Sequence, residues 1–371
     1  MDINRYNFQY QDLFQAPYFV DKSELLVLLN NSISSKDKNF CFSYPPGFGS
    51  TQILNMCEAY FSKECQTKFI FDNLNIKKDS SYLIHLNKHN VIYINMFQDR
   101  NLYEAVNDLI AQLCSKYNLE NIYDYKNLSE LFTIIMNECH EKFIVLIDNY
   151  DYFFDIDSKL YEGDKKVYLK FLKNFIIDQP YIELSIFFGI SEIKSLSEEL
   201  DSLEINNYSL FNIKQEGSFL GFNKNDVDKV YKEYLALLFK KVKIDRNELD
   251  IWYGGFCKDT YNCTCVIKAL KANKIMAYQN TFALLLIIYS KSSLSKFNFM
   301  KILNRILDNT NIKLSSIKVD SDDINQKDFA KDKLFRTLLS EGFLTLDENN
   351  NIKIPNKECR DSMIKATLKL I

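Results

Sequence analysis

The sequence predicts an α/β fold with a parallel sheet in the N-terminal half of the chain, followed by a mainly helical C-terminal half. Apolar, β-branched runs alternate with helical periodicity up to about residue 215, and the strand signal fades after that point. The 371 residues are 47% hydrophobic and 14% aromatic, which is enough for a sizeable core. We therefore expect one domain over residues 1–215 and a second over residues 216–371.

The predicted strands are short, continuous apolar runs with amphipathic helices between them. The strand runs are NFCFS (39–43), NVIYINM (90–96), KFIVLIDN (142–149) and LSIFFGI (184–190). The helical stretches are 53–61, 102–117 and 165–177, where apolar residues recur at three- and four-residue steps. Because strands that are apolar on both sides need cover on both sides, this alternation predicts a parallel sheet flanked by helices.

Helical periodicity continues through the C-terminal half and ends in a different pattern. The helical stretches are 221–242, 263–290 and 297–308. Residues 331–356 then read as a helix, a strand, a polar turn at Asn349–Asn351 and a second strand, which is the outline of a winged-helix-like module. The same pattern also fits a hairpin that only caps a helical domain. The polar and acidic stretch 315–328 predicts a mobile loop.

Charge and cysteine usage narrow the function classes. The net charge of −3 and the scarcity of arginine give no support to bulk attraction to nucleic acid or to an anionic membrane. The most apolar stretch, 281–290, is too short to span a bilayer. Nine irregularly spaced cysteines without a signal peptide predict reduced thiols and a cytoplasmic protein. His85 and His89 lie four residues apart with no carboxylate or cysteine completing a site, and we expect them at the surface.

Residues 44–52, YPPGFGSTQ, have the form of a phosphate-binding loop. They follow a predicted strand and precede a predicted helix, and Gly47 and Gly49 can supply the turn whose N–H groups cradle phosphates. Thr51 stands at the Mg²⁺-ligand position, but Ser50 stands where such a loop needs its lysine. Taken alone, the fragment also fits an ordinary strand–turn–helix connection.

A second fragment, FIVLIDNYD (143–151), ends a buried strand in a carboxylate. Asp148 is placed as a Walker B aspartate, which holds Mg²⁺. The next position, where ATPases commonly have a glutamate that activates water, is Asn149. An amide cannot accept a proton from water, so general-base catalysis at this position is lost.

Further segments follow the pattern of one family in order along the chain. YPPGFGSTQ aligns without a gap to a family loop of the form RPRRFGKSL, and LIDNYD (146–151) aligns to LIDEYD. The other segments are PYFVDKSELLVLL (17–29), FDNLNI (71–76), NVIYINMF (90–97), FFGIS (187–191), GFNKNDVDKVY (221–231), WYGGF (252–256), YNC (261–263), GFLT (342–345) and IPN (354–356). The chain thus resembles, over nearly its whole length, the AAA-ATPase-like proteins that often carry a C-terminal PD-(D/E)XK nuclease-like domain. The resemblance implies a P-loop NTPase-like sheet followed by a helical lid and the winged-helix-like module.

The departures from the family pattern fall on residues that serve nucleotide chemistry. Ser50 replaces the loop lysine, Asn149 replaces the Walker B glutamate, and Phe188 replaces the threonine of the sensor strand. Pro46 and Gly47 stand where the family has arginines, whereas the scaffold positions of VDK, FG, LID and YD persist. About fifteen residues follow IPN in this sequence, so we expect this chain to lack the nuclease-like domain.

These departures predict a catalytically inactive ATPase-like protein, without catalytic residues, that acts as a protein-binding or regulatory module. Vestigial nucleotide-binding residues are Gly47, Gly49, Ser50, Thr51, Asp148 and Asn149. Thr51 and Asp148 would ligate Mg²⁺ only if a nucleotide binds, and we expect no cofactor beyond weak ATP and Mg²⁺ binding. Two alternatives remain open: a nucleotide-binding switch without efficient hydrolysis, and a nucleic-acid- or ribosome-associated factor that uses the winged-helix-like tail. We expect a protein partner and no membrane association.

Overall fold

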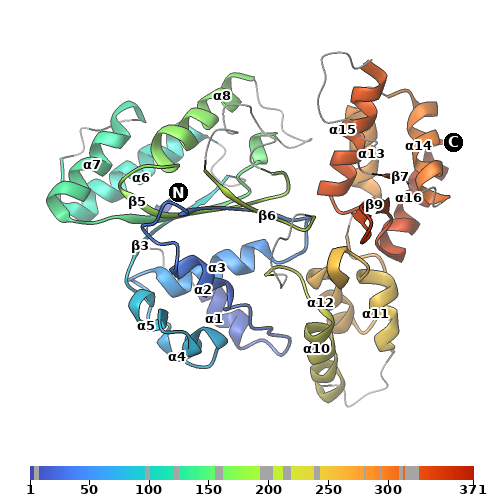
Figure 1. Ribbon diagram of the computed structural model, residues 1–371, viewed down its shortest axis with the longest axis horizontal. Coiled ribbons are helices and arrows are strands. Elements are labelled where there is room, and N and C mark those ends of the chain that lie inside the picture. The colour runs from blue at the N-terminus through green and yellow to red at the C-terminus, as the bar shows by residue number, and fades with distance from the viewer. Residues whose placement is uncertain are drawn as a thin grey trace. The chain divides into compact units, whose positions relative to one another are not determined.

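The chain forms two compact units in the computed structural model (Figure 1). Unit 1 comprises Met1–Ser43 and Ser50–Ser209, and unit 2 comprises Tyr44–Gly49 and Leu210–Ile371. The structure describes residues 1–3, 8–96, 101–120, 123, 125–154, 162–192, 204–211, 219–237, 243–279, 281–292, 294–308, 312–313 and 326–371. The two units are described separately below.

Unit 1 is built on a sheet whose strands, within the described residues, lie in the order β1-β3-β4-β5-β2-β6. The five strands β2 to β6 are parallel, and β1 pairs antiparallel with β3 at one edge. The strands are β1 (Asp2–Ile3), β2 (Asn39–Ser43), β3 (Asn90–Asn95), β4 (Phe143–Asp148), β5 (Ile182–Gly189) and β6 (Asn206–Ser209). All six residues of β4 are buried, which explains why this strand is apolar on both sides.

Helices cover both faces of this sheet. Figure 1 shows α1 to α5 on one face and α6, α7 and α8 on the other. Their bounds are α1 (Phe8–Phe14), α2 (Leu25–Asn30), α3 (Ser50–Phe61), α4 (Lys68–Phe71), α5 (Tyr82–His85), α6 (Leu102–Tyr117), α7 (Leu128–Cys139) and α8 (Glu162–Phe171). Helix α6 shows how the sequence sets these limits, because the Asn101 side chain accepts the N–H of Glu104 at its start and Asn118 takes a left-handed conformation at its end.

The predicted parallel sheet with flanking helices is confirmed, and β2, β3, β4 and β5 correspond to the four predicted strands. Strand β6 was not predicted. It contains the polar pair Asn206–Asn207 and is the last strand in the order of the sheet, where β2 is its one partner among the described residues. An edge strand is not buried on both faces and therefore lacks the apolar run that marks a central strand.

The first part of unit 2 is helical. Its helices are α10 (Lys224–Leu237), α11 (Arg246–Tyr253), α12 (Cys263–Ala272), α13 (Thr281–Lys291) and α14 (Lys296–Leu307). The predicted helical stretch 263–290 is wrong in its middle, because α12 and α13 are separate helices. Asn273 ends α12 in a left-handed conformation with φ of +49°. Its side chain then accepts the N–H of Lys243 at 3.1 Å, which fixes this turn in place.

The second part of unit 2 has winged-helix topology, which confirms the predicted winged-helix-like module. Strand β7 (Ile312–Lys313) precedes α15 (Gln326–Ser340), and the hairpin of β8 (Thr345–Leu346) and β9 (Asn351–Lys353) precedes α16 (Lys357–Leu370). The strands lie in the order β7-β9-β8 and are antiparallel. Asp347 forms the turn of the hairpin, because its carboxylate accepts the N–H groups of Asn349 at 2.9 Å and Asn351 at 2.8 Å. The predicted mobile loop 315–328 lies outside the described residues as far as residue 325.

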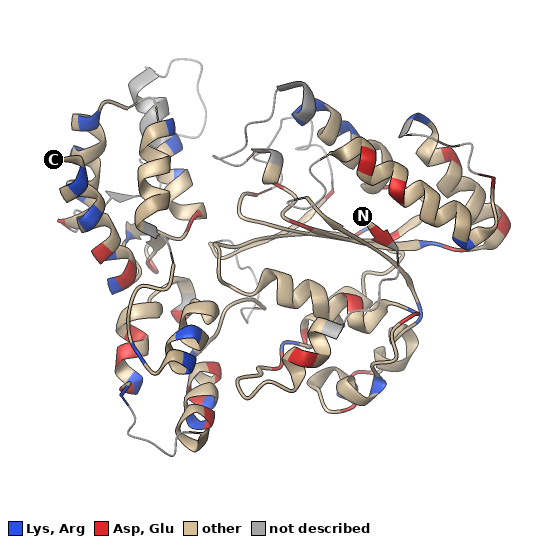
Figure 2. Ribbon diagram, turned by 180° about the vertical axis from the view of Figure 1, so that it is seen from behind, with Lys and Arg blue, Asp and Glu red and all other residues tan. Residues whose placement is uncertain are grey.

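Acidic and basic residues are mixed along the helices (Figure 2). Figure 2 shows both signs of charge interspersed on the helices of each unit. Of the helices that the structure describes, none combines the length and the apolar character needed to cross a membrane.

Candidate functional site

Thr51 and Asp148, which are far apart in the sequence, meet in unit 1. Thr51 lies in the first turn of α3, and Asp148 is the last residue of β4. The Thr51 hydroxyl donates to Asp148 Oδ2 at 3.2 Å, and the Tyr93 hydroxyl donates to the same oxygen at 3.3 Å. Hydroxyl and carboxylate oxygens are ligands that Mg²⁺ prefers. The pair therefore fits the Mg²⁺-ligating role expected of it. These contacts identify no further Mg²⁺ ligand.

Ser50 and Asn149 are the neighbours of this pair in the sequence, and neither carries the group that phosphoryl transfer requires. Ser50 begins α3 and presents a neutral hydroxyl where a lysine would supply a positive charge. Asn149 follows Asp148 with φ of +54°, a conformation that asparagine tolerates better than most residues. Its amide donates to Asn95 Oδ1 at 3.4 Å. The two positions supply neither a cation nor a proton acceptor.

Phe188 occupies the sensor position in β5 and is part of the core. Its side chain is fully buried and stacks on Phe42 of the neighbouring strand β2, with ring centroids 4.8 Å apart and an interplanar angle of 12°. Phe42 in turn stacks on Tyr208 of β6 at 5.2 Å. An apolar ring in this stack cannot hydrogen-bond a water molecule or a phosphate.

The loop Tyr44–Gly49 belongs to unit 2, and it contacts the start of α12. The carbonyl oxygen of Gly47 accepts a hydrogen bond from the N–H of Thr264 at 3.1 Å and another from the thiol of Cys263 at 3.2 Å. The first N–H groups of a helix have no partner within the helix. A loop carbonyl therefore satisfies one of the free N–H groups of α12.

The neighbouring carbonyls of the loop are also bound within unit 2. The carbonyl of Pro46 accepts from Asn262 Nδ2 at 3.0 Å and from Gln279 Nε2 at 2.9 Å. The carbonyl of Phe48 accepts from the N–H of Gly221 at 2.7 Å. Three successive carbonyls are thus held in place, which fixes the path of the backbone.

The backbone N–H groups of the loop differ from its carbonyls in their hydrogen bonding. Gly47 and Gly49 have φ of +89° and +92°, conformations that glycine adopts freely. A Cβ on Gly47 would lie 2.6 Å from the Asn262 amide, so a larger residue does not fit there. In the described part of the chain, no residue accepts a hydrogen bond from the N–H of Gly47, Phe48 or Gly49. Such free N–H groups are the element of a phosphate loop that binds anions.

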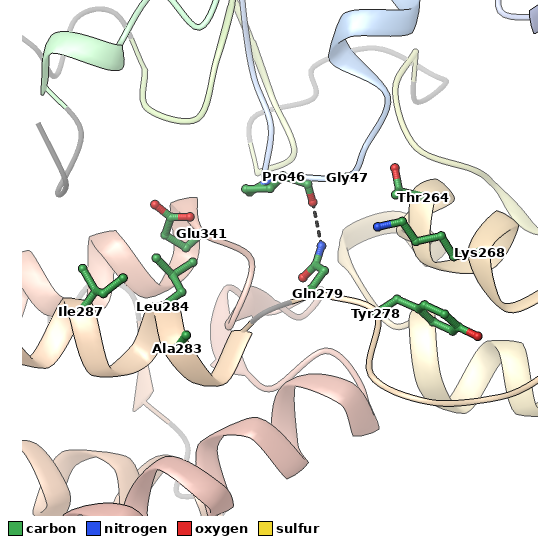
Figure 3. Close-up of a pocket in the computed structure, with 10 residues that line it drawn as sticks. All are labelled: Pro46, Gly47, Thr264, Lys268, Tyr278, Gln279, Ala283, Leu284, Ile287 and Glu341. Atoms are coloured by element: carbon green, nitrogen blue, oxygen red, sulfur yellow. Dashed lines mark hydrogen bonds between the residues drawn. The ribbon is translucent and has the colours of Figure 1, made fainter. Parts of the chain in front are cut away.

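A cavity of about 420 Å³ in unit 2 borders the carbonyl side of this loop (Figure 3). Figure 3 shows the Gln279 side chain crossing to the Pro46 carbonyl, Lys268 on one side of the cavity and Glu341 on the other. The remaining lining residues are Gly47, Thr264, Tyr278, Ala283, Leu284 and Ile287. Phosphate binding uses the N–H groups of such a loop and not its carbonyls, so we do not assign a nucleotide to this cavity.

The persistent YD of LIDNYD has a structural role in unit 1. The Asp151 carboxylate accepts the N–H groups of Ile190 at 2.8 Å and of Ser191 at 2.6 Å, which holds the chain directly after β5. Gly189 is required beside it, because a Cβ there would lie 2.6 Å from both Asp151 Oδ1 and a ring carbon of Tyr150. Burial raises the pKa of the Tyr150 hydroxyl well above its ordinary value. The packing and hydrogen bonds of Tyr150 and Asp151 explain why this part of the family pattern is present in the chain.

The VDK segment also has a structural role. Asp21 accepts the N–H of Ser23 at 2.8 Å and the N–H of Asn75 at 2.7 Å. Ser23 is buried, and its hydroxyl accepts the N–H of Ile76 at 3.0 Å. These bonds tie two family segments, FVDKS and FDNLNI, to each other.

In unit 2 the family segments WYGGF and IPN pack together. Gly255 has φ of +77°, and a Cβ on it would lie 2.0 Å from the carbonyl oxygen of Pro355. The Asn356 side chain donates to the carbonyl of Gly254 at 3.1 Å, and Lys357 Nζ lies 4.9 Å from the ring centre of Trp252. WYGGF therefore holds the start of α16.

Glu358 connects α16 to the turn that carries Gln279. Its carboxylate is buried and accepts the N–H groups of Tyr278 and Gln279, the latter at 2.9 Å. Desolvation by burial raises the pKa of this carboxyl above its ordinary value of 4.5, against the opposing effect of the two N–H groups. The loop carbonyl of Pro46 is thus linked through Gln279 to a buried titratable group.

The raised pKa of Glu358 predicts a pH dependence of stability. Between pH 4.5 and the raised pKa, the folded protein binds more protons at this site than the unfolded chain does. The contribution is therefore complete at low pH and is lost as pH rises through the folded pKa. Glu358→Gln is expected to make the free energy of unfolding, measured by urea denaturation from pH 5 to 8, less dependent on pH. Glu348→Gln, which removes an exposed carboxylate of the hairpin, is the control. An unchanged pH profile in Glu358→Gln would contradict the prediction.

Several residues of this region were not predicted from the sequence. Tyr93 contacts Asp148. Asn262 and Gln279 donate hydrogen bonds to the Pro46 carbonyl, and Glu358 accepts the backbone N–H of Gln279. Asn262 was detectable in one respect, since an asparagine before an amphipathic stretch indicates a helix N-cap, and its side chain accepts the N–H of Cys265 at 3.0 Å. No local sequence pattern indicates the second hydrogen bond of Asn262, which it donates to the Pro46 carbonyl.

The parallel sheet and the strand–loop–helix that carries Thr51 beside Asp148 define a fold of the P-loop NTPase class. A sequence profile of the family described as "Predicted AAA-ATPase" (AAA-ATPase-like) matches residues 9–197, which is more than half of the chain. The chain belongs to this AAA-ATPase-like family. This confirms the family resemblance deduced from the ordered motifs.

Three of the solved structures that match the chain are the following. The ORC2 protein of Aeropyrum pernix in its ADPNP–ADP complexes is 12% identical with a TM-score of 0.47, and the match covers 98% of this chain and 92% of that one. A Walker-type ATPase of Pyrococcus abyssi is 12% identical with a TM-score of 0.46, covering 92% of this chain and 94% of that one. Drosophila ORC bound to DNA gives 10% identity and a TM-score of 0.35, covering 96% of this chain and 90% of that one. No curated protein sequence matches the chain significantly.

Proposed function

We propose that this protein is a pseudo-ATPase, an AAA-ATPase-like chain that does not hydrolyse ATP and acts as a protein-binding or regulatory module. One observation supports this most strongly. The Thr51–Asp148 pair persists at 3.2 Å, whereas Phe188 fills the polar sensor position with a buried ring stacked on Phe42. The scaffold of the family is retained and its chemistry is not.

The substitutions act on separate requirements of phosphoryl transfer. The reaction depends on positioning and on neutralising the charge that develops on the transferred group. Ser50 supplies no charge, and Asn149 cannot accept the proton of an attacking water. Loss of one electrostatic group typically reduces the rate by about 10²–10³-fold. Losses at two or more such positions leave no useful turnover.

A protein-binding role is supported by an apolar stripe on α16. Ile364, Leu368 and Ile371 follow one another at helical spacing and are 39%, 64% and 80% exposed. Phe297 of the neighbouring helix α14 is also largely exposed, at 74%. Contiguous exposed apolar side chains are typical of protein contact surfaces.

The nucleotide-binding switch is a second candidate, and the loop N–H groups favour it. The N–H groups of Gly47, Phe48 and Gly49 have no acceptor among the described residues, as the anion site of a phosphate loop requires. The nucleic-acid alternative is not favoured by the hairpin, whose turn carries Asp347 and Glu348 and would repel a phosphate backbone. We therefore do not extend the proposal to nucleic acid.

Turnover and binding measurements separate these functions. We expect phosphate release from MgATP by the wild type to equal that of Thr51→Val and Asp148→Asn, because none of the three can catalyse the reaction. Calorimetry with ATP and Mg²⁺ is expected to show no saturable binding in the micromolar range. Turnover that Thr51→Val abolishes would show an active enzyme and overturn the proposal. Micromolar ATP binding that Asp148→Asn weakens, without turnover, would establish the switch instead.

A further inference from the structure

His85 and His89 form a chain of side chains with Glu183 in unit 1. His85 ends α5, His89 directly precedes β3, and Glu183 is the second residue of β5. All three therefore lie near the amino ends of parallel strands, whereas Asp148 lies at the carboxyl end of β4. The side chains of His89 and Glu183 are only 11% and 14% exposed, which corrects the expectation that these histidines lie freely at the surface.

The distances define which ring nitrogens face one another. His89 Nδ1 lies 2.6 Å from Glu183 Oε1, and His89 Nε2 lies 3.1 Å from His85 Nδ1. A carboxylate only accepts hydrogen bonds, so His89 Nδ1 carries the proton that it donates to Glu183. In the neutral ring, His89 Nε2 then carries no proton, and its lone pair faces His85 Nδ1. Without a metal, His85 Nδ1–H donates to this lone pair.

The spacing of the two nitrogens matches that of a shared metal ion. Two imidazole nitrogens that ligate one tetrahedral Zn²⁺ at 2.0–2.1 Å lie about 3.4 Å apart, close to the observed 3.1 Å. Glu183 occupies the second-shell position of a carboxylate–histidine–metal arrangement, in which a carboxylate fixes the tautomer and raises the basicity of the ligand ring. We propose that His85 Nδ1 and His89 Nε2 bind a divalent transition-metal ion of the Zn²⁺ and Cu²⁺ class.

Metal binding at this pair requires no net loss of a proton. The His85 proton moves from Nδ1 to Nε2 when the metal takes the Nδ1 lone pair, and His89 keeps its Nδ1 proton on Glu183. No cluster of three or more His, Cys, Asp or Glu ligands occurs within the described residues, so water completes the coordination. His85 is half-buried, so solvent reaches part of this residue. Imidazole ligands favour Cu²⁺ over Zn²⁺ and do not retain Mg²⁺.

The experiment uses the whole protein with histidine side chains labelled with ¹⁵N. The chain has three histidines, and exposed His140 at the end of α7 is an internal control. Addition of Zn²⁺ is expected to shift the ring nitrogens of His85 and His89 and to leave those of His140 unchanged, whereas Mg²⁺ shifts none. His140→Asn is expected to retain the response, and His89→Asn to abolish it. Glu183→Gln is expected to weaken Zn²⁺ binding by about 10-fold or more.

The control variants keep the outcome clear. Histidine signals report ligation directly, so Zn²⁺ bound by any of the nine thiols does not imitate the result. If the His85 and His89 signals stay unchanged with Zn²⁺ and Cu²⁺, the proposal is wrong and the three residues form only a structural hydrogen-bond chain. If Glu183→Gln, folded by circular dichroism, binds Zn²⁺ as tightly as the wild type, the role given to Glu183 in fixing the His89 ring is wrong. The wild-type titration decides the matter even if His89→Asn does not fold.

Discussion

Phe188→Ala is expected to lower the free energy of unfolding by about 4 kcal/mol, since it removes a fully buried aromatic side chain from a packed strand pair. The loss has two parts, the transfer energy of the ring and the cavity left between β5 and β2. Urea denaturation followed by far-ultraviolet circular dichroism measures the change. Chains with two compact units need not unfold in a single step, so the transition to be measured is the one in which β5 also loses its protection from hydrogen exchange.

Two controls test whether the stack itself is responsible. Phe297→Ala removes an aromatic ring that is 74% exposed and is expected to change stability by less than about 1 kcal/mol. The double variant Phe42→Ala, Phe188→Ala is expected to cost less than the sum of the single variants, by about 1 kcal/mol, because the two rings contact each other. A loss in Phe188→Ala no larger than that in Phe297→Ala would mean that the sensor position is not part of the core.

This result bears on the proposed loss of catalysis. Phe188→Thr restores the family residue and is expected to be nearly as destabilising, because it exchanges buried apolar volume for a hydroxyl in an apolar stack. The aromatic residue has become part of the support for β2, the strand that leads to the loop at Tyr44. Reversal of the chemistry therefore requires rebuilding of the surrounding core, which Phe42 and Tyr208 also form.

Much of the sheet could be predicted because its central strands obey a simple rule. Strand β4 is covered on both faces, so every residue from Phe143 to Ile147 is apolar and buried. Strand β6 lies at the edge and carries Asn206 and Asn207, so that rule does not apply to it. The end of α12 at Asn273 depends on one left-handed residue within a stretch of otherwise continuous helical periodicity.

The candidate site also has a part that the sequence pattern predicts and a part that it does not. The proximity of Thr51 and Asp148 follows from the strand–loop–helix pattern, because the carboxyl ends of parallel strands meet at one edge of a sheet. The contacts of the Pro46 carbonyl come from Asn262 and Gln279, more than two hundred residues away in the sequence. Such long-range side-chain bonds depend on the packing of whole helices and leave no periodic trace. The same holds for Glu183, which reaches His89 from another strand.

Among the described glycines of unit 2, Gly255 is the one where an added Cβ would make the shortest contact, because WYGGF packs on IPN. Gly255→Ala is expected to lower the free energy of unfolding by about 3 kcal/mol or more. A left-handed alanine costs about 1–2 kcal/mol, and overpacking adds about 1–3 kcal/mol. The added Cβ would lie 2.0 Å from the Pro355 carbonyl oxygen, a backbone atom that cannot rotate away. Relief of this overlap requires a shift of Pro355 and therefore of the start of α16, whose N-cap is Asn356.

The measurement is urea denaturation combined with hydrogen exchange in α16, where the loss of protection is expected to be greatest. Asn118→Ala isolates the conformational part of the cost, because Asn118 is left-handed and exposed at the end of α6, and a loss of about 1 kcal/mol is expected. The difference between the two variants then measures the overlap with Pro355. Equal losses would mean that the segment moves aside without strain, and that WYGGF does not fix the position of α16.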